Sequence, residues 1–401
     1  MLFGEKNPVR KISFFTLTLL LLVLIPVLTG LTGVKTYAAD IPSLKVSAKA
    51  AVLMEPYTGK VLLEQNPHEK LPPASVTKIM TILLIYEALE DGKIKMDDIV
   101  TVSAHAASMG GSQVYLEEME QQSVRDLLKS VVVASANDSS VALAEFISGS
   151  EEGFVASMNE KAKSLGMADT NFVNSCGLPA AGHLTSAYDI ALMSRELITK
   201  YPQVYELTQI WMDKIIHRTA RGEEEFGLSN TNRLIKSYSG ATGLKTGSTK
   251  EALYCLSATA QRDDLNLISV VLAAPDSATR FHEAMRMLDY GFANYKVQKG
   301  DEAGKVMGKI RVFKGEVLET DFAVKTQIST LIGKSNSIDM QSHLEVLDAI
   351  SAPCPAGSKA GEIVYTFDGK EVGRSDLITT EDIKRVTLPE MMQRLFYRWF
   401  Y

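Results

Sequence analysis

The sequence predicts an α/β fold, in which an antiparallel sheet carries a helical insertion, followed by a small all-β domain. Two short apolar strands, 51–54 and 60–63, are joined around Pro56 and Gly59, and a second strand pair, 253–260 and 267–273, is joined by a polar turn. The helical segments lie between these two pairs, whose turns are too short for parallel crossovers. From residue 300 the segments are short, rich in Val, Ile and Thr, and separated by Gly or Asp-Gly.

The first predicted helix covers residues 75–89. Pro72 and Pro73 precede it, and Gly92 follows it. Its apolar residues cover nearly the whole circumference, so we expect this helix to lie inside the domain. Further helices are predicted at 124–133, 138–147, 153–165 and 187–198, and an amphipathic helix carries Phe281, Ala284, Met285, Leu288 and Phe292 on one stripe.

The β-rich part is predicted to cover 300–385, with a hairpin whose strands 362–367 and 370–373 meet at Asp368-Gly369. The last segment, 386–401, is predicted to form an aromatic, mildly basic amphipathic helix. Its apolar residues at helical spacing are Leu388, Met391, Met392, Leu395, Phe396 and Trp399. This pattern favours a helix on a membrane surface, and the alternative is a helix docked on its own domain.

Composition excludes several classes of protein. The chain has 401 residues, 46% apolar and 22% charged, which indicates more than one folded domain. Acidic residues outnumber basic ones by 48 to 42, and no basic block accompanies an aromatic run, so no nucleic-acid partner is expected. Cys176, Cys255 and Cys354 allow at most one disulfide, have no metal-site spacing, and are interpreted as buried free thiols.

Residues 1–38 have the layout of a cleaved signal peptide. Lys6, Arg10 and Lys11 precede an apolar run from 12 to 28, and the small residues Ala38 and Ala39 follow. An uncleaved membrane anchor is the alternative, and either implies export. Cleavage leaves 38 basic and 47 acidic residues, a net charge of −9. Export together with a C-terminal helix on the membrane surface predicts a place at the outer face of the cytoplasmic membrane.

Ser75 and Lys78 form the only SxxK in the chain, at the start of the predicted buried helix. Residues three apart share a helix face. The helix dipole and the apolar surroundings both disfavour a charged lysine there, so we expect a lowered pKa and a usable base beside the hydroxyl. Alternatively, Ser75 only caps the helix while Lys78 extends to solvent.

Two further motifs argue for the functional interpretation. Ser135-Ala136-Asn137 is an SxN after an apolar stretch, and Lys245-Thr246-Gly247 is a KTG before a predicted strand. A second SxN at 157–159 falls inside an amphipathic helix and is interpreted as chance. SxxK, SxN and KTG in this order resemble the penicillin-recognising serine acyltransferases, which include class A β-lactamases and penicillin-binding proteins.

The segments around these motifs narrow the resemblance to one branch. LPPASVTKIMTILLIYEAL, SLGMADTNFVNSCGLP, GHLTSAYDIALMSREL, NTNRLI and GLKTGSTKEALYCLSATA are similar to low-molecular-mass penicillin-binding proteins, serine-type D-alanyl-D-alanine carboxypeptidases of a peptidase S11-like family. The resemblance covers about residues 45–295. It implies a β-lactamase/transpeptidase-like domain at 39–295, an antiparallel sheet with helices on both faces and a helical insertion. It also implies peptidoglycan stem peptides as substrate, β-lactams as inhibitors and no cofactor or metal.

The resemblance also implies a role for each matching residue. Ser75 would be the acylated nucleophile, Lys78 its base, and Ser135 a proton relay to the leaving amine. Asn137 would hold the substrate carbonyl and steady Lys78. Lys245 and Thr246 would bind the terminal carboxylate, Gly247 would leave room for the substrate backbone, and the N–H groups of Ser75 and Ser248 would form the oxyanion hole.

One departure from the family, one residue of open role and three alternative functions remain. Ser248 stands where some relatives carry histidine, and His183 either touches substrate or packs its loop. A class A β-lactamase is disfavoured because no Glu-x-x-Leu-Asn follows the SxN. A non-catalytic cell-wall sensor is disfavoured by the intact motif residues. No HExxH occurs, since Arg286 stands where its second histidine would be, so metalloprotease chemistry is also disfavoured.

Overall fold

The computed structural model describes residues 45–219, 222–335 and 339–400. The predicted signal segment, 1–38, lies outside the described residues.

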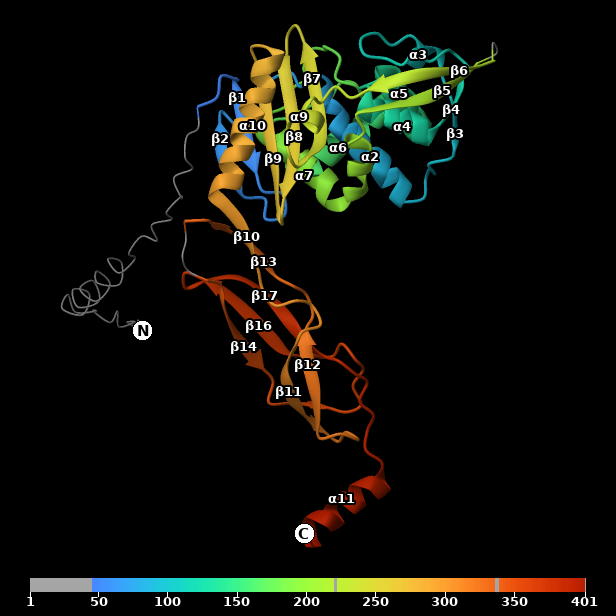
Figure 1. The fold of residues 1–401 in the computed structure, drawn as a ribbon. Coiled ribbons are helices and arrows are strands. Elements are labelled where there is room, and N and C mark those ends of the chain that lie inside the picture. The colour runs from blue at the N-terminus through green and yellow to red at the C-terminus, as the bar shows by residue number, and fades with distance from the viewer. Residues whose placement is uncertain (1–44, 220–221, 336–338, 401) are drawn as a thin grey trace, which may run out of the picture. The chain divides into compact units, whose positions relative to one another are not determined.

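A five-stranded antiparallel sheet forms the first part of the described chain (Figure 1). Its order is β2-β1-β9-β8-β7, so strands from both ends of this part lie side by side, as predicted. The strands are β1 (Ala50–Met54), β2 (Val61–Gln65), β7 (Ala241–Thr249), β8 (Leu253–Arg262) and β9 (Leu265–Ala274). Strand β7 stands at one edge of this sheet.

Helices cover both faces of the sheet, which explains why β1 is apolar throughout. Val52 and Met54 point into one core cluster, while Ala51 and Leu53 point into the other, because successive strand residues face opposite sides. The first cluster includes α2 (Lys78–Glu90) and α7 (Ala187–Lys200), and α10 (Ser277–Asn294) closes the second. The remaining helices here are α3 (Ala104–Ala107), α4 (Val124–Val133), α5 (Asn137–Ser148), α6 (Glu151–Ser164), α8 (Tyr205–Thr208) and α9 (Leu234–Ser237).

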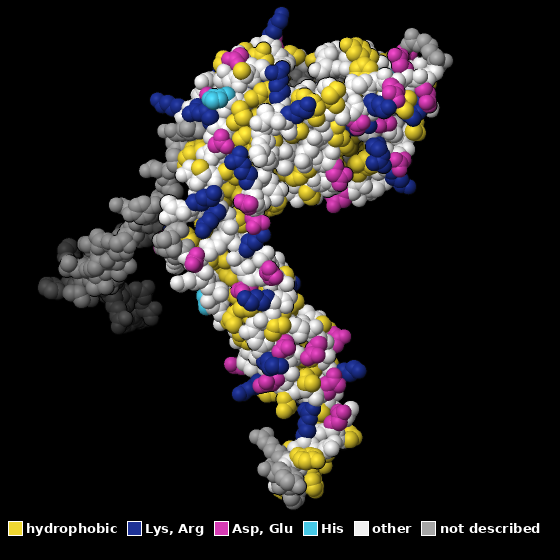
Figure 2. Space-filling model, viewed as in Figure 1, with side chains coloured by type: hydrophobic (Ala, Val, Ile, Leu, Met, Phe, Trp, Pro, Cys, Tyr) yellow, Lys and Arg dark blue, Asp and Glu magenta, His cyan; other side chains and the backbone are white. Residues whose placement is uncertain are grey.

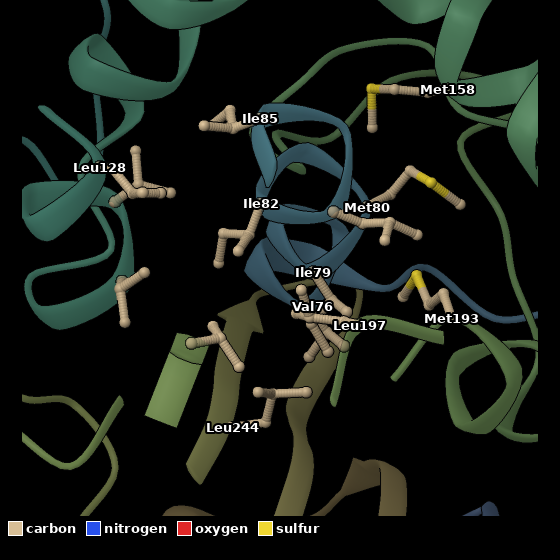
Figure 3. Close-up of a cluster of buried hydrophobic side chains, with 14 of the residues drawn as sticks. Val76, Ile79, Met80, Ile82, Ile85, Leu128, Met158, Met193, Leu197 and Leu244 are labelled. Carbon is tan, nitrogen blue, oxygen red and sulfur yellow. The ribbon is translucent and has the colours of Figure 1, made fainter. Parts of the chain in front are cut away.

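Helix α2 lies at the centre of the larger core, as its apolar circumference predicts. Figure 3 shows Ile79, Ile82 and Ile85 directed toward side chains from other elements, among them Leu128 of α4 and Leu197 of α7. The predicted start of this helix needs correction. Residues Ala74–Thr77 form a 3₁₀ turn, and the α-helix begins at Lys78. Ala74, the first residue of this tighter turn, has a φ of 49°, which is unusual for a residue with a side chain.

Several strands escaped sequence analysis. The hairpin of β5 (Met212–Thr219) and β6 (Gly222–Ser229), the short pair β3 (Ile99–Thr101) and β4 (Gln121–Ser123), and β7 itself were not predicted. The turn predicted between β8 and β9 is shorter than expected, because both strands extend until only Asp263 and Asp264 separate them. Cys176, Cys255 and Cys354 are buried free thiols, as predicted.

The C-terminal part is all β, as predicted. Strands β10 (Tyr295–Lys299) and β13 (Ser329–Gly333) form a two-stranded sheet. A six-stranded sheet has the order β14-β16-β17-β12-β11-β15. Its strands are β11 (Val306–Phe313), β12 (Glu319–Val324), β14 (Gln341–Val346), β15 (Ala349–Ser351), β16 (Lys359–Phe367) and β17 (Lys370–Thr379). Asp368 and Gly369 form the predicted turn between β16 and β17.

Helix α11 (Leu388–Phe400) ends the described chain and is exposed along most of its length. Figure 2 shows hydrophobic side chains on its surface, and Leu388, Leu395, Phe396 and Trp399 are each more than half exposed. Among the described residues, no helix combines the length and the apolar character needed to cross a membrane.

Candidate active site

Ser75 and Lys78 lie together where the 3₁₀ turn becomes α2. The Lys78 Nζ is 3.1 Å from the Ser75 Oγ, 2.6 Å from the Asn137 Oδ1 and 2.7 Å from the carbonyl oxygen of Cys176. Lys78 is fully buried, whereas Ser75 is partly open to solvent. The alternative in which Lys78 extends into water is therefore wrong.

Burial lowers the pKa of Lys78 to about 8, against weaker opposing contributions from Cys176 and Asp138. This is the direction that the apolar helix predicted. Roughly one-tenth of such a lysine is neutral at pH 7, compared with well under one-thousandth for an ordinary lysine. The site therefore holds a buried amine that can release its proton near neutral pH.

The SxN motif approaches Lys78 from the N-terminus of α5. Asn137 donates from Nδ2 to the carbonyl oxygen of Gly110 at 2.6 Å, so its Oδ1 is the atom turned toward Lys78. Its backbone N–H donates to the carbonyl of Ser112 at 2.7 Å. The next residue, Asp138, accepts from the N–H of Val114 at 3.0 Å. The loop that precedes the motif thus fixes the orientation of the Asn137 amide.

The KTG motif lies within the edge strand β7. Sequence analysis placed the motif only ahead of the predicted strand 253–260, and did not predict β7. Lys245 is buried and donates from Nζ to the Ser135 Oγ at 2.9 Å and to the carbonyl of Thr246 at 3.1 Å. Burial first, then the charges of Lys78 and Arg280, hold the pKa of Lys245 well below its ordinary value. Lys245 therefore links the third motif to the second.

Gly247 brings β7 against the start of the SxxK segment. A Cβ on Gly247 would lie 2.9 Å from both the Pro73 carbonyl oxygen and the Ser75 nitrogen. Those are backbone atoms that cannot move aside, so only glycine permits this approach. Ser248 follows and is exposed, while the Thr246 hydroxyl lies 2.7 Å from the Thr231 hydroxyl.

Other candidates do not join this cluster. Asn159 of the second SxN bonds the Phe172 carbonyl from within α6, which fits the interpretation of that match as chance. His183 is buried, with its Nε2 2.8 Å from the Thr77 hydroxyl and its Nδ1 accepting from the Val173 N–H at 3.1 Å. Both ring nitrogens are engaged within the protein, which supports loop packing over substrate contact.

Sequence analysis missed Arg280 of α10. Its Nη1 donates to the carbonyl oxygens of Gly247 at 3.0 Å and Cys255 at 3.2 Å, so it ties β7 to β8 beside the KTG. Burial lowers the pKa of Arg280 to about 10, and its guanidinium lies over the rings of Tyr254 and Phe281. A lone arginine in an amphipathic helix gave no signal of this contact.

Comparison with known proteins decides the family. A family profile described as D-alanyl-D-alanine carboxypeptidase matches residues 35–276, and one described as penicillin-binding protein 5, C-terminal domain, matches residues 295–385. The chain belongs to the D-alanyl-D-alanine carboxypeptidase family. As a member it is a serine-type carboxypeptidase, a hydrolase with a cell-wall function.

Curated members of the carboxypeptidase family match almost end to end. The D-alanyl-D-alanine carboxypeptidase DacF of Bacillus subtilis is 44% identical over 353 residues, covering 88% of this chain and 90% of the relative. The carboxypeptidase DacC of Escherichia coli is 35% identical over 374 residues, with the same two shares covered.

Solved structures of the family show the same architecture. Penicillin-binding protein 5 of Haemophilus influenzae is 31% identical, with a TM-score of 0.68 over 85% of this chain and 98% of that one. Penicillin-binding protein D2 of Listeria monocytogenes, solved in its ampicillin-bound form, is 34% identical, with a TM-score of 0.52 over 63% of this chain and 99% of that one.

Proposed function

We propose that this carboxypeptidase is exported and removes the terminal D-alanine from peptidoglycan stem pentapeptides through an acyl-enzyme on Ser75. The observation that carries the proposal is the set of contacts around the Lys78 amine. A neutral amine has two N–H donors and one lone pair. The Asn137 Oδ1 and the Cys176 carbonyl are acceptors and take the two N–H groups, which leaves the lone pair to face the Ser75 hydroxyl.

In the acylation step, Lys78 takes the Ser75 proton while the Ser75 Oγ attacks the carbonyl carbon of the penultimate D-alanine. The negative charge on the carbonyl oxygen is received by the N–H groups of Ser75 and Ser248. Ser75 is at the start of a 3₁₀ turn, where N–H groups lack partners within the turn. One such donor typically contributes about 3 kcal/mol to lowering the barrier.

The C–N bond then breaks, and the departing D-alanine amine needs a proton. Ser135 passes the proton held by Lys78 to this amine. Its Oγ accepts from Lys245, so its own hydroxyl hydrogen is available to donate. Water next attacks the ester, releases the shortened peptide and restores Ser75.

The substrate peptide binds along the edge strand β7. Lys245 and Thr246 bind the terminal carboxylate, whose negative charge favours the protonated form of the buried Lys245 amine. The cation formed there favours the neutral form of Lys78. Gly247 lets the substrate backbone pair with β7. Asn137 supports the substrate carbonyl through the remaining hydrogen of its Nδ2.

We further propose β-lactam inhibition, in which the opened ring stays tethered on Ser75 where water should enter. The ampicillin-bound relative supports this proposal.

We also propose the organisation and location of the chain. Residues 1–38 are a signal peptide, 39–295 the catalytic domain and 300–385 the β-rich domain. Residues 386–401 attach the protein to the outer face of the cytoplasmic membrane.

The deciding experiment measures free D-alanine released from a purified stem pentapeptide. The wild-type protein should release it, and Ser75→Ala should not. Fluorescent penicillin separates the rivals. Stable labelling that Ser75→Ala loses supports a carboxypeptidase, rapid probe hydrolysis indicates a β-lactamase, and absence of any reaction indicates a sensor.

A further inference from the structure

A pocket of about 330 Å³ lies where the five-stranded sheet meets the two-stranded sheet of β10 and β13, and the proposed function assigns it no role. It is lined by the turn after β1, the turn between β8 and β9, and parts of β10 and β13. Leu331 of β13 belongs to the same core cluster as Leu53 of β1 and Leu265 of β9, so the walls are packed into one unit. The volume is in the range of small-molecule sites, about 300–1,000 Å³.

The pocket is separate from the catalytic cluster. Gly247 of the KTG pairs with Cys255 on β8, and the pocket begins six residues further along that strand, at Gln261. At about 3.3 Å per residue, this separation is roughly 20 Å. A ligand in the pocket therefore leaves Ser75 open to the substrate peptide.

Asn266 gives the pocket a free hydrogen-bonding group. Leu265 and Leu267 on either side of it belong to the core cluster that α10 closes, so the side chain of Asn266 points to the opposite face of the sheet. Only 7% of Asn266 is exposed, yet its amide makes no hydrogen bond to any residue that the structure describes. Buried amides almost always have partners. An amide carries both donors and an acceptor, so this one can bind an amide group of a ligand at two points.

Tyr57 supplies an aromatic ring to the same pocket and is 63% exposed. The turn that carries it is held firmly. The buried Glu55 carboxylate accepts from the N–H groups of Tyr57 at 3.0 Å and Thr58 at 2.7 Å. Arg195 donates from Nε to the carbonyl oxygen of Pro56. The ring therefore offers a large contact area at a small cost in ordering when a ligand binds.

The charged groups of the lining are already occupied. Asp264 accepts from the Lys299 ammonium at 2.6 Å, and the Glu55 carboxylate is bonded within its own turn. The rest of the lining consists of hydroxyl, amide and hydrocarbon surface. The pocket therefore favours a neutral polar ligand with an apolar face over an ion.

We propose that this pocket binds an N-acetylated amino sugar of the cell-wall glycan and so holds the enzyme on the polymer that carries its substrate. The C–H face of the sugar ring packs on Tyr57. The N–H of the acetamido group donates to the Asn266 Oδ1, and its carbonyl accepts from the Asn266 Nδ2. The cell-wall function of the family supplies the source of this ligand. The inference requires neither the acyl-enzyme nor a particular direction of the peptide.

The test titrates the full chain with a tetramer of β-1,4-linked N-acetylglucosamine and with cellotetraose, which carries a hydroxyl in place of each acetamido group. Calorimetry should show that wild type binds the acetylated tetramer about tenfold more tightly. Asn266→Leu keeps about the same side-chain volume and should remove this difference. Tyr57→Ala should weaken binding of both tetramers by about two- to tenfold, whereas Tyr57→Phe should not.

Tyr115→Ala is the matched control, because it removes a ring that is 65% exposed and lies outside the pocket lining. It should bind both tetramers as wild type does. Equal affinity of wild type for the two tetramers, or an acetyl preference that survives Asn266→Leu, would overturn the sugar site. Tyr57→Ala and Asn266→Leu should still release D-alanine from a free pentapeptide at the wild-type rate. Absence of that release in wild type would refute the proposed function and leave the sugar site standing.

Purified cell-wall glycan from which the stem peptides have been cleaved tests the source of the sugar. Without stem peptides it offers nothing to the catalytic cluster. Wild type should sediment with this glycan, and Tyr57→Ala and Asn266→Leu should remain largely in solution. Binding of the acetylated tetramer without sedimentation on the glycan would overturn the assignment to the cell wall.

Discussion

The Nη1 of Arg280 donates a 3.0 Å hydrogen bond to the carbonyl oxygen of Gly247, the glycine of the KTG. The same nitrogen reaches the carbonyl of Cys255 on β8, so one buried guanidinium holds two neighbouring strands in register. Gly247 in turn touches the backbone at Ser75. Helix α10, on the far side of the sheet from α2, thereby helps to set the distance between the edge strand and Ser75, the proposed nucleophile.

Arg280→Lys should weaken catalysis more than it weakens folding. A lysine keeps the charge, but its side chain is one bond shorter than that of arginine, so its Nζ does not reach the position from which Nη1 donates to both carbonyls. We expect acylation by fluorescent penicillin to slow by about tenfold, because small displacements of a reacting group are costly. Arg280→Met should in addition lower the free energy of unfolding by about 1–3 kcal/mol, since buried carbonyls lose their donor. Unchanged acylation by both variants would mean that Arg280 does not position β7.

Lys78→Met should abolish acylation while the protein stays folded. Methionine fills the space of the lysine stem but offers no base, and a positioned base typically contributes 10²- to 10⁴-fold. Labelling with fluorescent penicillin measures the loss, and circular dichroism checks the fold. Lys163→Met, at an exposed position on α6, is the control and should label normally. Normal labelling of Lys78→Met would remove this lysine from the mechanism.

Acylation should accelerate as the pH rises through 8. The pKa of Lys78 is lowered to about 8, and only the neutral amine accepts a proton. Below that pKa the neutral fraction grows about tenfold per pH unit, so the rate should rise about fivefold from pH 7 to pH 8 and level off above pH 9. The second-order rate of labelling by a penicillin reports this directly, because the penicillin carboxylate does not titrate in that range. A rate constant that does not vary between pH 6 and 9 would contradict the role of Lys78.

Gly247→Ala should lose activity through steric displacement alone. Its new methyl group would meet the Pro73 carbonyl and the Ser75 nitrogen at 2.9 Å, so either β7 or the SxxK turn must shift. A shift near 1 Å costs about 100-fold in rate. Gly227→Ala on β6 is a matched control, because a Cβ there meets nothing within 4 Å. Equal D-alanine release by the two variants would show that close approach at Gly247 is unnecessary.

Local signals were sufficient for elements whose apolar spacing or turn residues are regular. Helix α4 was predicted at its observed bounds, because its apolar spacing is regular and Ser123 caps it by accepting from the Asp126 N–H. The turn at Asp368-Gly369 was also predicted correctly, because Asp-Gly between two strand-like segments is a strong hairpin signal. Strand β7 was not predicted, because its sequence, ATGLKTGST, consists mainly of small and polar residues and lacks the alternation of apolar and polar residues that marks a strand. That composition suits an edge strand, and it is compatible with the proposed pairing of substrate along β7.

The partners within the site are set by distant contacts that no local pattern encodes. The motifs identified Lys78 and its expected partner Asn137, but the Cys176 carbonyl that also receives the Lys78 amine lies 98 positions along the chain. The Gly110 carbonyl, which orients Asn137, and Arg280, which bonds Gly247, belong to segments without a motif. Composition and periodicity report burial, whereas these contacts depend on how buried segments meet.

Removal of α11 should release the protein from membranes. The helix exposes Leu388, Met392, Leu395, Phe396 and Trp399, and a helix with such a face gains free energy by burying it at the lipid interface. Arg394 of the same helix donates to the carbonyl oxygens of Gly315 and Glu316, so docking on the β-rich domain is the competing role. We expect the signal-free chain to sediment with lipid vesicles and a variant ending at Arg385 to stay in solution.

Leu395→Glu tests the apolar face without removing the Arg394 contact, and Gln393→Glu adds the same charge at a position that the sequence pattern leaves polar. If the helix binds membranes, Leu395→Glu should weaken sedimentation far more than Gln393→Glu, and raised salt should not reverse binding that depends on apolar area. If the helix only docks, truncation should lower the Tm of the protein and leave its distribution between vesicles and solution unchanged. Sedimentation of the truncated variant at the full-length level would therefore exclude α11 as the membrane anchor.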